Sequence, residues 1–177
     1  MRRFSRGVRR LAVVLAALAP VAALAEFDED YDARQWQEVA VQLPPAPEGK
    51  NLLPFYVSAT TDNRFFVDGA SLAVGGDGVV RYVLVVEAGG GARNVTYEGL
   101  RCETKELRVY AFGQRDGSWS KARNNDWRRI RDAIANRQHV ALFSEYLCPP
   151  GMGLISADAM REALRRGGHP QNQGNNR

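Results

Sequence analysis

The chain has 177 residues, of which 45% are hydrophobic, and it carries 24 basic and 20 acidic side chains. A net charge of +4 would suit a nucleic-acid-binding protein, but five of the arginines lie in residues 1–25, which contain no acidic residue. The remaining 152 residues therefore have a net charge of −1. They have the length of one domain with a single core and no global basic field to attract nucleic acid.

Residues 1–25 have the three parts of a secretory signal peptide. Five arginines lie in the first ten residues, residues 11–24 are uncharged and apolar, and the segment closes on Ala23-Leu24-Ala25. A membrane anchor is the rival interpretation, but the apolar run has 14 residues and is interrupted by Pro20, whereas a spanning helix needs roughly 20 residues. We expect cleavage after Ala25 and export to the periplasm. No cysteine lies at this point, so we do not expect a lipoprotein, and no later stretch predicts a transmembrane segment.

The exported chain is predicted to have three parts. Residues 26–50 combine an acidic arm, in which like charges repel, with a linker whose three prolines favour an extended chain. Residues 51–170 form a single α+β domain. Residues 171–177 are a polar tail that we expect to be disordered.

Strand-like runs fill the first half of this domain, and glycine-rich turns separate them. The longest β-branched run, Val79–Glu87, is predicted to be a central strand. Gly75–Gly78 precedes it and Gly89–Gly91 follows it, and glycine tolerates the positive φ of tight hairpins. Neither turn continues as a phosphate-binding loop would. Further runs lie at Leu53–Ser58, Phe65–Val67, Ser71–Val74, Ala92–Tyr97 and Leu107–Phe112.

The last third of the chain changes to helical spacing. Apolar side chains recur at helical intervals over residues 126–136, which predicts a helix. Residues 139–148 are apolar and fit either a helix or a strand. Another helix is predicted to begin at the N-cap Ser156 and to end before Gly167. The fold class is therefore α+β: a twisted antiparallel β-meander covered on one face by two or three C-terminal helices.

Two cysteines, Cys102 and Cys148, lie in the exported part. Two thiols in an oxidising compartment most simply form a disulfide. A redox pair usually has the spacing C-x-x-C, and a metal site needs three or four closely spaced ligands. Neither pattern is present, so we predict a structural disulfide between Cys102 and Cys148, no metal site and no cofactor.

Five sequence blocks follow one another in the predicted domain: Asn51–Phe55, Arg64–Asp68, Gly76–Tyr82, Asn94–Cys102 and Glu145–Pro149. In order and spacing they resemble the cryptic neisserial protein-like family, a group of small exported proteobacterial proteins. The resemblance covers nearly all of residues 51–170. It implies export, a single domain and the pairing of the two cysteines, and it implies no catalytic residue.

The only two histidines are His139 and His169. His139 could be the centre of a hydrolase site with Glu145, Asp132 or Ser144, but no G-x-S-x-G motif supports such a site. We favour a structural role for His139. We expect His169, at the end of the last helix, to be exposed.

Charged residues offer two candidate binding sites. Glu98 and Arg101 lie in one family-like block, where they could form a buried ion pair or line a polar pocket, and we favour the ion pair. Residues 121–137 contain six basic groups. Arg128 and Arg131 among them could bind an anionic envelope polymer or form the solvated face of the predicted helix. We favour the solvated face.

We therefore expect a non-enzymatic periplasmic domain that binds or supports an unidentified component of the cell envelope. The alternative is a periplasmic hydrolase of a cell-wall or lipid substrate that uses His139 and a carboxylate. An enzyme requires His139 to open into a cleft beside an acid or a nucleophile. A binding module requires instead an apolar or basic patch on its surface.

Overall fold

A computed structural model describes residues 36–133 and 136–169 of the chain. The predicted signal peptide, the acidic part of the predicted arm and the predicted C-terminal tail lie outside the described residues. Among the helices that are described, none combines the length and the apolar character needed to cross a membrane.

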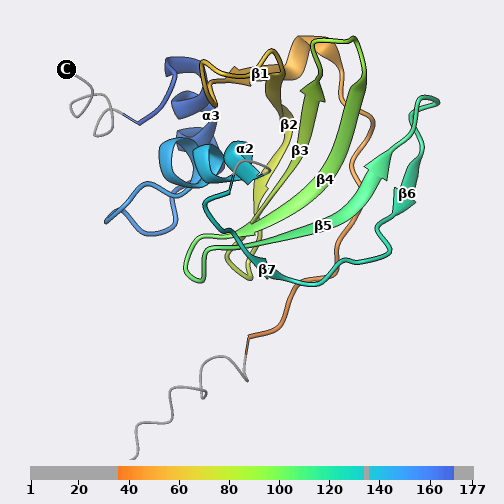
Figure 1. The fold of residues 1–177 in the computed structure, drawn as a ribbon. Helices are drawn as coiled ribbons and strands as arrows, with labels where there is room; N and C mark the ends of the chain where they lie inside the picture. The colour runs from red at the N-terminus through yellow and green to blue at the C-terminus, as the bar shows by residue number, and fades with distance from the viewer. Residues whose placement is uncertain (1–35, 134–135, 170–177) are drawn as a thin grey trace, which may run out of the picture. The chain divides into compact units, whose positions relative to one another are not determined.

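Within these residues, seven strands form one antiparallel sheet. Strands β1 to β6 are neighbours in chain order, and β7 pairs with β5 (Figure 1). The predicted meander is therefore confirmed. The strands are β1 (Leu52–Phe55), β2 (Arg64–Val74), β3 (Val79–Glu87), β4 (Arg93–Arg101), β5 (Glu106–Gly113), β6 (Trp119–Lys121) and β7 (Arg128–Arg129), and the short 3-10 helix η1 (Gly49–Asn51) precedes them.

Strand β2 joins two of the apolar runs into one strand of 11 residues. Its register against β3 shifts between Asp68 and Ala73. At this irregularity the carboxylate of Asp68 accepts hydrogen bonds from the backbone N–H groups of Ala70 at 3.3 Å and Ser71 at 3.2 Å. The side chain thus replaces the ladder partners that the bulge removes.

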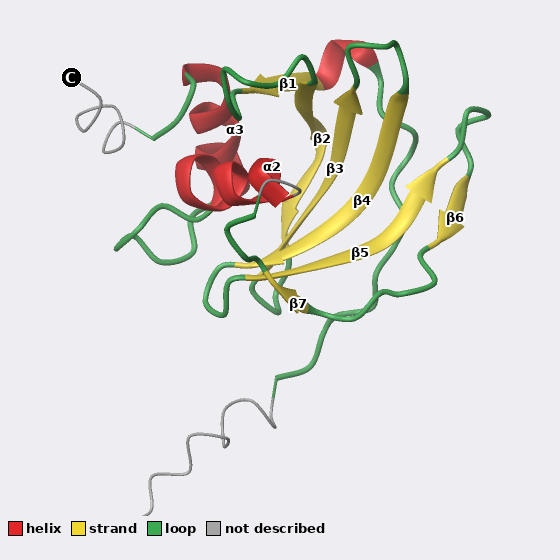
Figure 2. Ribbon diagram, in the orientation of Figure 1, coloured by secondary structure: helices red, strands yellow, loops and turns green. Residues whose placement is uncertain are grey.

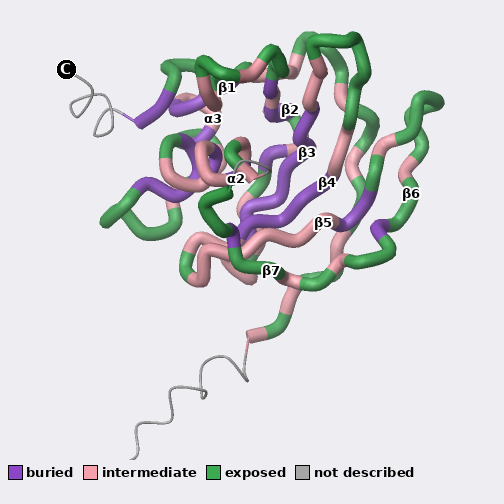
Figure 3. The backbone as a smooth tube through the Cα atoms, viewed as in Figure 1, coloured by how far each residue is buried: buried purple, intermediate pink, exposed green. Residues whose placement is uncertain are grey.

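Strand β3 lies in the middle of the sheet, as its β-branched run predicts, and its alternation divides the core between the two faces. Val80, Tyr82 and Leu84 pack in the cluster that includes the helices. Val83 and Val85 pack in a second cluster on the opposite face. Figure 3 shows that the buried backbone is concentrated in the central strands and in parts of the helices.

The C-terminal helices cover one face of the sheet (Figure 2). They are α2 (Arg137–Ala141), the π-helical segment η3 (Leu142–Leu147) and α3 (Ala157–Arg166). The predicted caps of α3 are confirmed: the Ser156 hydroxyl accepts from the N–H of Ala159 at 3.2 Å, and Gly167 ends the helix at a φ of 77°. The Cys102–Cys148 disulfide, also confirmed, ties the turn between β4 and β5 to the end of η3.

The helix predicted over residues 126–136 is wrong for the described part of that range. Arg128 and Arg129 form β7 instead, paired with Leu107 and Glu106 of β5. The N–H of Ile130 continues this pairing with a 2.9 Å hydrogen bond to the carbonyl of Lys105. Strand β6 pairs only with the far half of β5, so the near half offers free backbone groups to residues 128–130. This tertiary pairing overrides the helical spacing.

Residues 36–48, here called the strap, contain no helix or strand and run along the face of the sheet opposite the helices. Val41 packs against the second core cluster. The indole N–H of Trp119 donates to the carbonyl of Pro44 at 2.8 Å. The strap therefore covers part of the face that the helices leave open.

Candidate anion-binding site

A buried ion pair joins the sheet to the first helix. The Nε2 atom of His139 on α2 lies 3.0 Å from Oε2 of Glu98 on β4. Only 9% of His139 and 2% of Glu98 are exposed. Two hydroxyl groups also donate hydrogen bonds to the carboxylate of Glu98, that of Tyr82 at 3.0 Å and that of Thr96 at 2.7 Å.

The surroundings of both members of this pair favour its charged form. Burial alone would raise the pKa of Glu98, but the charge of His139 and the hydrogen bonds from His139, Thr96 and Tyr82 together lower it. Burial alone would lower the pKa of His139, but the charge and the hydrogen bond of Glu98 raise it. The charges and hydrogen bonds within the pair therefore favour an imidazolium beside a carboxylate.

The strand geometry explains why these residues meet. Tyr82 is the register partner of Glu98 across β3 and β4, and Thr96 is two residues away, so all three side chains lie on one face. Arg101 is three residues from Glu98 and lies on the other face. The expected pair of Glu98 with Arg101 is accordingly not formed within the described chain.

Arg101 instead belongs to an aromatic cluster on the strap side. Its guanidinium lies 3.9 Å from the ring centre of Trp36 and 5.8 Å from that of Trp127. Its Nη1 atom lies 3.0 Å from a carboxylate oxygen of Glu106. Arg101 is thus occupied by a stacking contact and an ion pair.

A pocket of about 440 Å³ opens beside His139. Its apolar lining comes from β5 and Ile130, and its polar lining comes mainly from the β7 region. The lining residues are Leu107, Val109, Arg128, Arg129, Ile130, Arg131, Asn136 and His139. The pocket therefore brings three of the predicted candidates, His139, Arg128 and Arg131, to one place, with Glu98 bonded behind His139.

The arginines of this pocket are available to a ligand. Arg128, Arg129 and Arg131 are exposed, and none of them forms an ion pair with another described residue. The nearest acidic register partner, Glu106, is bonded to Arg101 and to the hydroxyl of Thr104. The pocket consequently has uncompensated positive charge around an apolar floor.

The hydrolase candidates are not assembled around His139. Glu145, Ser144 and Asp132 line a different cavity, of about 540 Å³, on the side of Tyr56 and Gly167. The described lining of the His139 pocket includes no hydroxyl, thiol or carboxylate side chain. His139 thus has an acid partner in Glu98 but no described nucleophile beside it.

His169 is buried, which contradicts its expected exposure. Only 6% of its surface is accessible. Its ring Nε2 lies 2.8 Å from the carbonyl oxygen of Tyr146, and its N–H donates to the carbonyl of Glu145 at 3.1 Å. The chain turns back at Gly167 and places His169 against η3, so His169 has a structural role.

A polar cluster that no sequence pattern predicted is centred on Glu38 of the strap. The carboxylate of Glu38 accepts hydrogen bonds from the guanidinium groups of Arg81 at 3.3 Å and of Arg108. It also accepts from the hydroxyl of Tyr110 at 2.5 Å and from the indole N–H of Trp127 at 3.2 Å. No local signal could have revealed this cluster, because its other members lie 43 to 89 residues from Glu38 in sequence.

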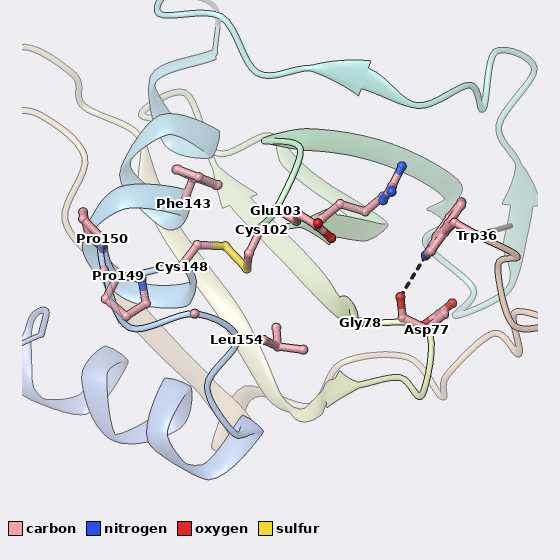
Figure 4. Close-up of a pocket in the computed structure, with 13 residues that line it drawn as sticks. Trp36, Asp77, Gly78, Cys102, Glu103, Phe143, Cys148, Pro149, Pro150 and Leu154 are labelled. Carbon is pink, nitrogen blue, oxygen red and sulfur yellow. Dashed lines mark hydrogen bonds between the residues drawn. A yellow bond between two sulfur atoms is a disulfide. The ribbon is translucent and has the colours of Figure 1, made fainter. Parts of the chain in front are cut away.

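A third cavity, of about 530 Å³, lies beside the disulfide (Figure 4). Cys102, Cys148, Phe143 and Leu154 supply much of its apolar lining. Trp36 borders it from the strap, and its indole N–H donates to the carbonyl of Asp77 at 3.0 Å, the dashed line in Figure 4.

Within the described residues no group of three or more His, Cys, Asp or Glu side chains could hold a metal ion.

Comparison with known proteins identifies relatives of the chain. The family model described as the CNP1-like family matches residues 31–165. Cryptic neisserial protein 1 of Neisseria gonorrhoeae (strain ATCC 700825 / FA 1090) is 23% identical over 159 residues, which cover 81% of this chain and 78% of that protein. No solved structure matches the chain. The resemblance inferred from the five sequence blocks is thereby confirmed.

Proposed function

Because the chain belongs to the CNP1-like family, whose description names no activity, we propose a function from the site: an exported periplasmic domain that binds an anionic component of the cell envelope. One observation carries this proposal. Three arginines without described acidic partners surround a single pocket with an apolar floor, together with His139, whose protonated form Glu98 favours. Guanidinium groups bind carboxylate and phosphate oxygens through paired hydrogen bonds.

Binding is favoured over catalysis by the chemistry of the lining. Arginine and imidazolium are donors that hold an anion, and the described lining has no group that would attack it. No specific observation favours the hydrolase alternative. The signal-peptide pattern supports export, and the Cys102–Cys148 disulfide suits an oxidising compartment.

Vesicle binding tests the proposal. The purified chain should bind vesicles of phosphatidylglycerol and phosphatidylcholine more tightly than vesicles of phosphatidylcholine alone, and salt should weaken this binding. The Arg128→Gln, Arg131→Gln double variant should lose about tenfold in affinity, as the loss of a charged hydrogen bond typically causes. Both residues are exposed, so its melting temperature should match that of the wild type.

The matched control is the Arg115→Gln, Arg123→Gln double variant. These arginines are also exposed, and neither lines the His139 pocket. Equal losses in the two double variants would indicate nonspecific charge attraction. Full binding by the pocket variant would exclude the pocket as the binding site.

Export is tested separately by cell fractionation and intact-mass measurement. The mature protein should be recovered from the periplasm with Glu26 as its first residue. Recovery from the cytoplasm, or a mass that retains Met1, would contradict this part of the proposal.

A further inference from the structure

We propose that the His139 pocket is a phosphoryl-binding site in which the Nδ1 atom of His139 donates a hydrogen bond directly to a phosphoryl oxygen of the ligand. This inference rests on the proposed function and names the chemical group that the same site binds. It assigns His139 a direct binding role in addition to its ion pair with Glu98.

One ring nitrogen of His139 is buried without a hydrogen-bond partner among the described residues. The Nε2 atom of His139 is used by Glu98, whereas Nδ1 is buried and has no hydrogen-bond partner in the described chain. Two other buried nitrogens share this property, Nε of Arg81 and Nε of Arg108, but neither arginine lines the His139 pocket. Unpaired buried polar atoms are rare in folded proteins. His139 lines the pocket, so a ligand acceptor there would satisfy Nδ1 after a small movement of side chains that exposes this buried atom.

The surroundings of His139 favour the protonated form of its ring. Tyr82 and Thr96 donate to Glu98, so this carboxylate is held in its ionised form deep in the core. An ionised carboxylate at 3.0 Å stabilises the imidazolium form of His139. In the imidazolium both ring nitrogens carry hydrogen. In that form Nδ1 is a donor with a positive charge, and it requires an anionic or strongly polarised oxygen.

The charged side chains that line the pocket favour an anion with several diverging oxygens. The charged groups that line the pocket come from two parts of the chain: His139 from α2, and Arg128, Arg129 and Arg131 from β7 and the segment that follows it. A carboxylate presents two oxygens in one plane, whereas a phosphoryl group presents three diverging oxygens and more negative charge. A phosphoryl group can therefore accept from the imidazolium and the guanidinium groups together.

The apolar side chains of the pocket favour a ligand that carries an apolar group beside its anion. Leu107, Val109 and Ile130 line the same pocket. An inorganic ion would leave these side chains without a partner, whereas a phosphate ester would place carbon atoms against them. The site consequently fits a phosphoryl group attached to an apolar body, whether a lipid or a soluble ester.

Nuclear magnetic resonance of the purified chain tests the inference. The ring resonances of His139 are followed through a pH series with phenyl phosphate, with benzoate or without addition. Phenyl phosphate should raise the pKa of His139, because an anion that binds the imidazolium stabilises it. Benzoate, which has the same apolar ring and a planar anion, should cause a smaller change. An equal change with benzoate would overturn the assignment of a phosphoryl group.

Variants separate direct binding by His139 from a structural role. His139→Gln should weaken phenyl phosphate binding by about tenfold. Glu98→Gln should weaken phenyl phosphate binding at neutral pH. Binding to this variant should recover at lower pH, where His139 becomes protonated without help from a carboxylate. This recovery keeps the test informative if His139→Gln fails to fold, because a merely structural role predicts no recovery.

Two outcomes distinguish this inference from the proposed function. If phenyl phosphate leaves the His139 resonances unchanged while the Arg128→Gln, Arg131→Gln variant still loses vesicle binding, the inference fails and the proposed function stands. If neither effect is seen, both fail. Vesicles of phosphatidic acid identify the source: competition between these vesicles and phenyl phosphate supports a lipid phosphate, and binding of phenyl phosphate without vesicle binding supports a soluble ester.

Discussion

Replacement of Glu98 by alanine tests the energetic importance of the buried pair. The change leaves the imidazolium of His139 buried without its partner, and it also removes the acceptor of Tyr82, which is fully buried. Removal of one member of a buried ion pair typically costs about 3–5 kcal/mol. We therefore expect the free energy of unfolding to fall by about that amount.

A matched control is available on the neighbouring strand. Glu106 also pairs with an arginine, Arg101, at 3.0 Å, but 26% of the Glu106 side chain and 18% of the Arg101 side chain are exposed. Partly solvated pairs contribute about 0–1 kcal/mol. Glu106→Ala should therefore be several times less destabilising than Glu98→Ala.

Equilibrium unfolding in urea with the disulfide intact measures both changes. The comparison is valid where the dependence of the unfolding free energy on urea is the same in the three proteins. A loss for Glu98→Ala within about 1 kcal/mol of the loss for Glu106→Ala would refute the reasoning. The pair would then be solvated in solution, and Glu98 would not stabilise the imidazolium form of His139.

Three further predictions concern pH, the disulfide and one glycine. The raised pKa of His139 and the lowered pKa of Glu98 stabilise the fold most where the unfolded carboxyl is ionised and the unfolded imidazole is protonated, about pH 4.3 to 6.5. The difference in the free energy of unfolding between the wild type and Glu98→Gln should therefore shrink as the pH rises through the folded pKa of His139 or falls through that of Glu98. A difference that is independent of pH would contradict the charged pair. The Cys102→Ser, Cys148→Ser variant opens a loop with a sequence separation of 46, so its free energy of unfolding should be about 4 kcal/mol lower than that of the wild type. Alkylation of the unreduced wild type should add no mass. Gly99→Ala should destabilise the fold measurably in thermal unfolding, because its Cβ would lie 2.8 Å from Cζ of Tyr110, while Gly76→Ala, which meets no atom within 4 Å, should be tolerated.

The sequence by itself determined the features that depend on neighbouring residues. The turns Gly75–Gly78 and Gly89–Gly91 separate strands that pair in chain order, because a short hairpin leaves an antiparallel neighbour as the accessible partner. The ends of α3 were predictable for the same reason, since Ser156 and Gly167 act on the backbone within a few residues. The pairing of the cysteines followed from their number and from the predicted export.

Only the tertiary structure decided the site. Residues 128–130 have helical spacing, yet they pair with a free edge of β5 whose existence depends on where β6 stops. That choice places Arg128 and Arg131 beside His139. Glu98 meets His139 across 41 residues of sequence, and it cannot meet Arg101 because an odd spacing on a strand puts two side chains on opposite faces. Such contacts depend on which face each element buries, and a pattern along one segment carries no information about the face that another segment presents to it.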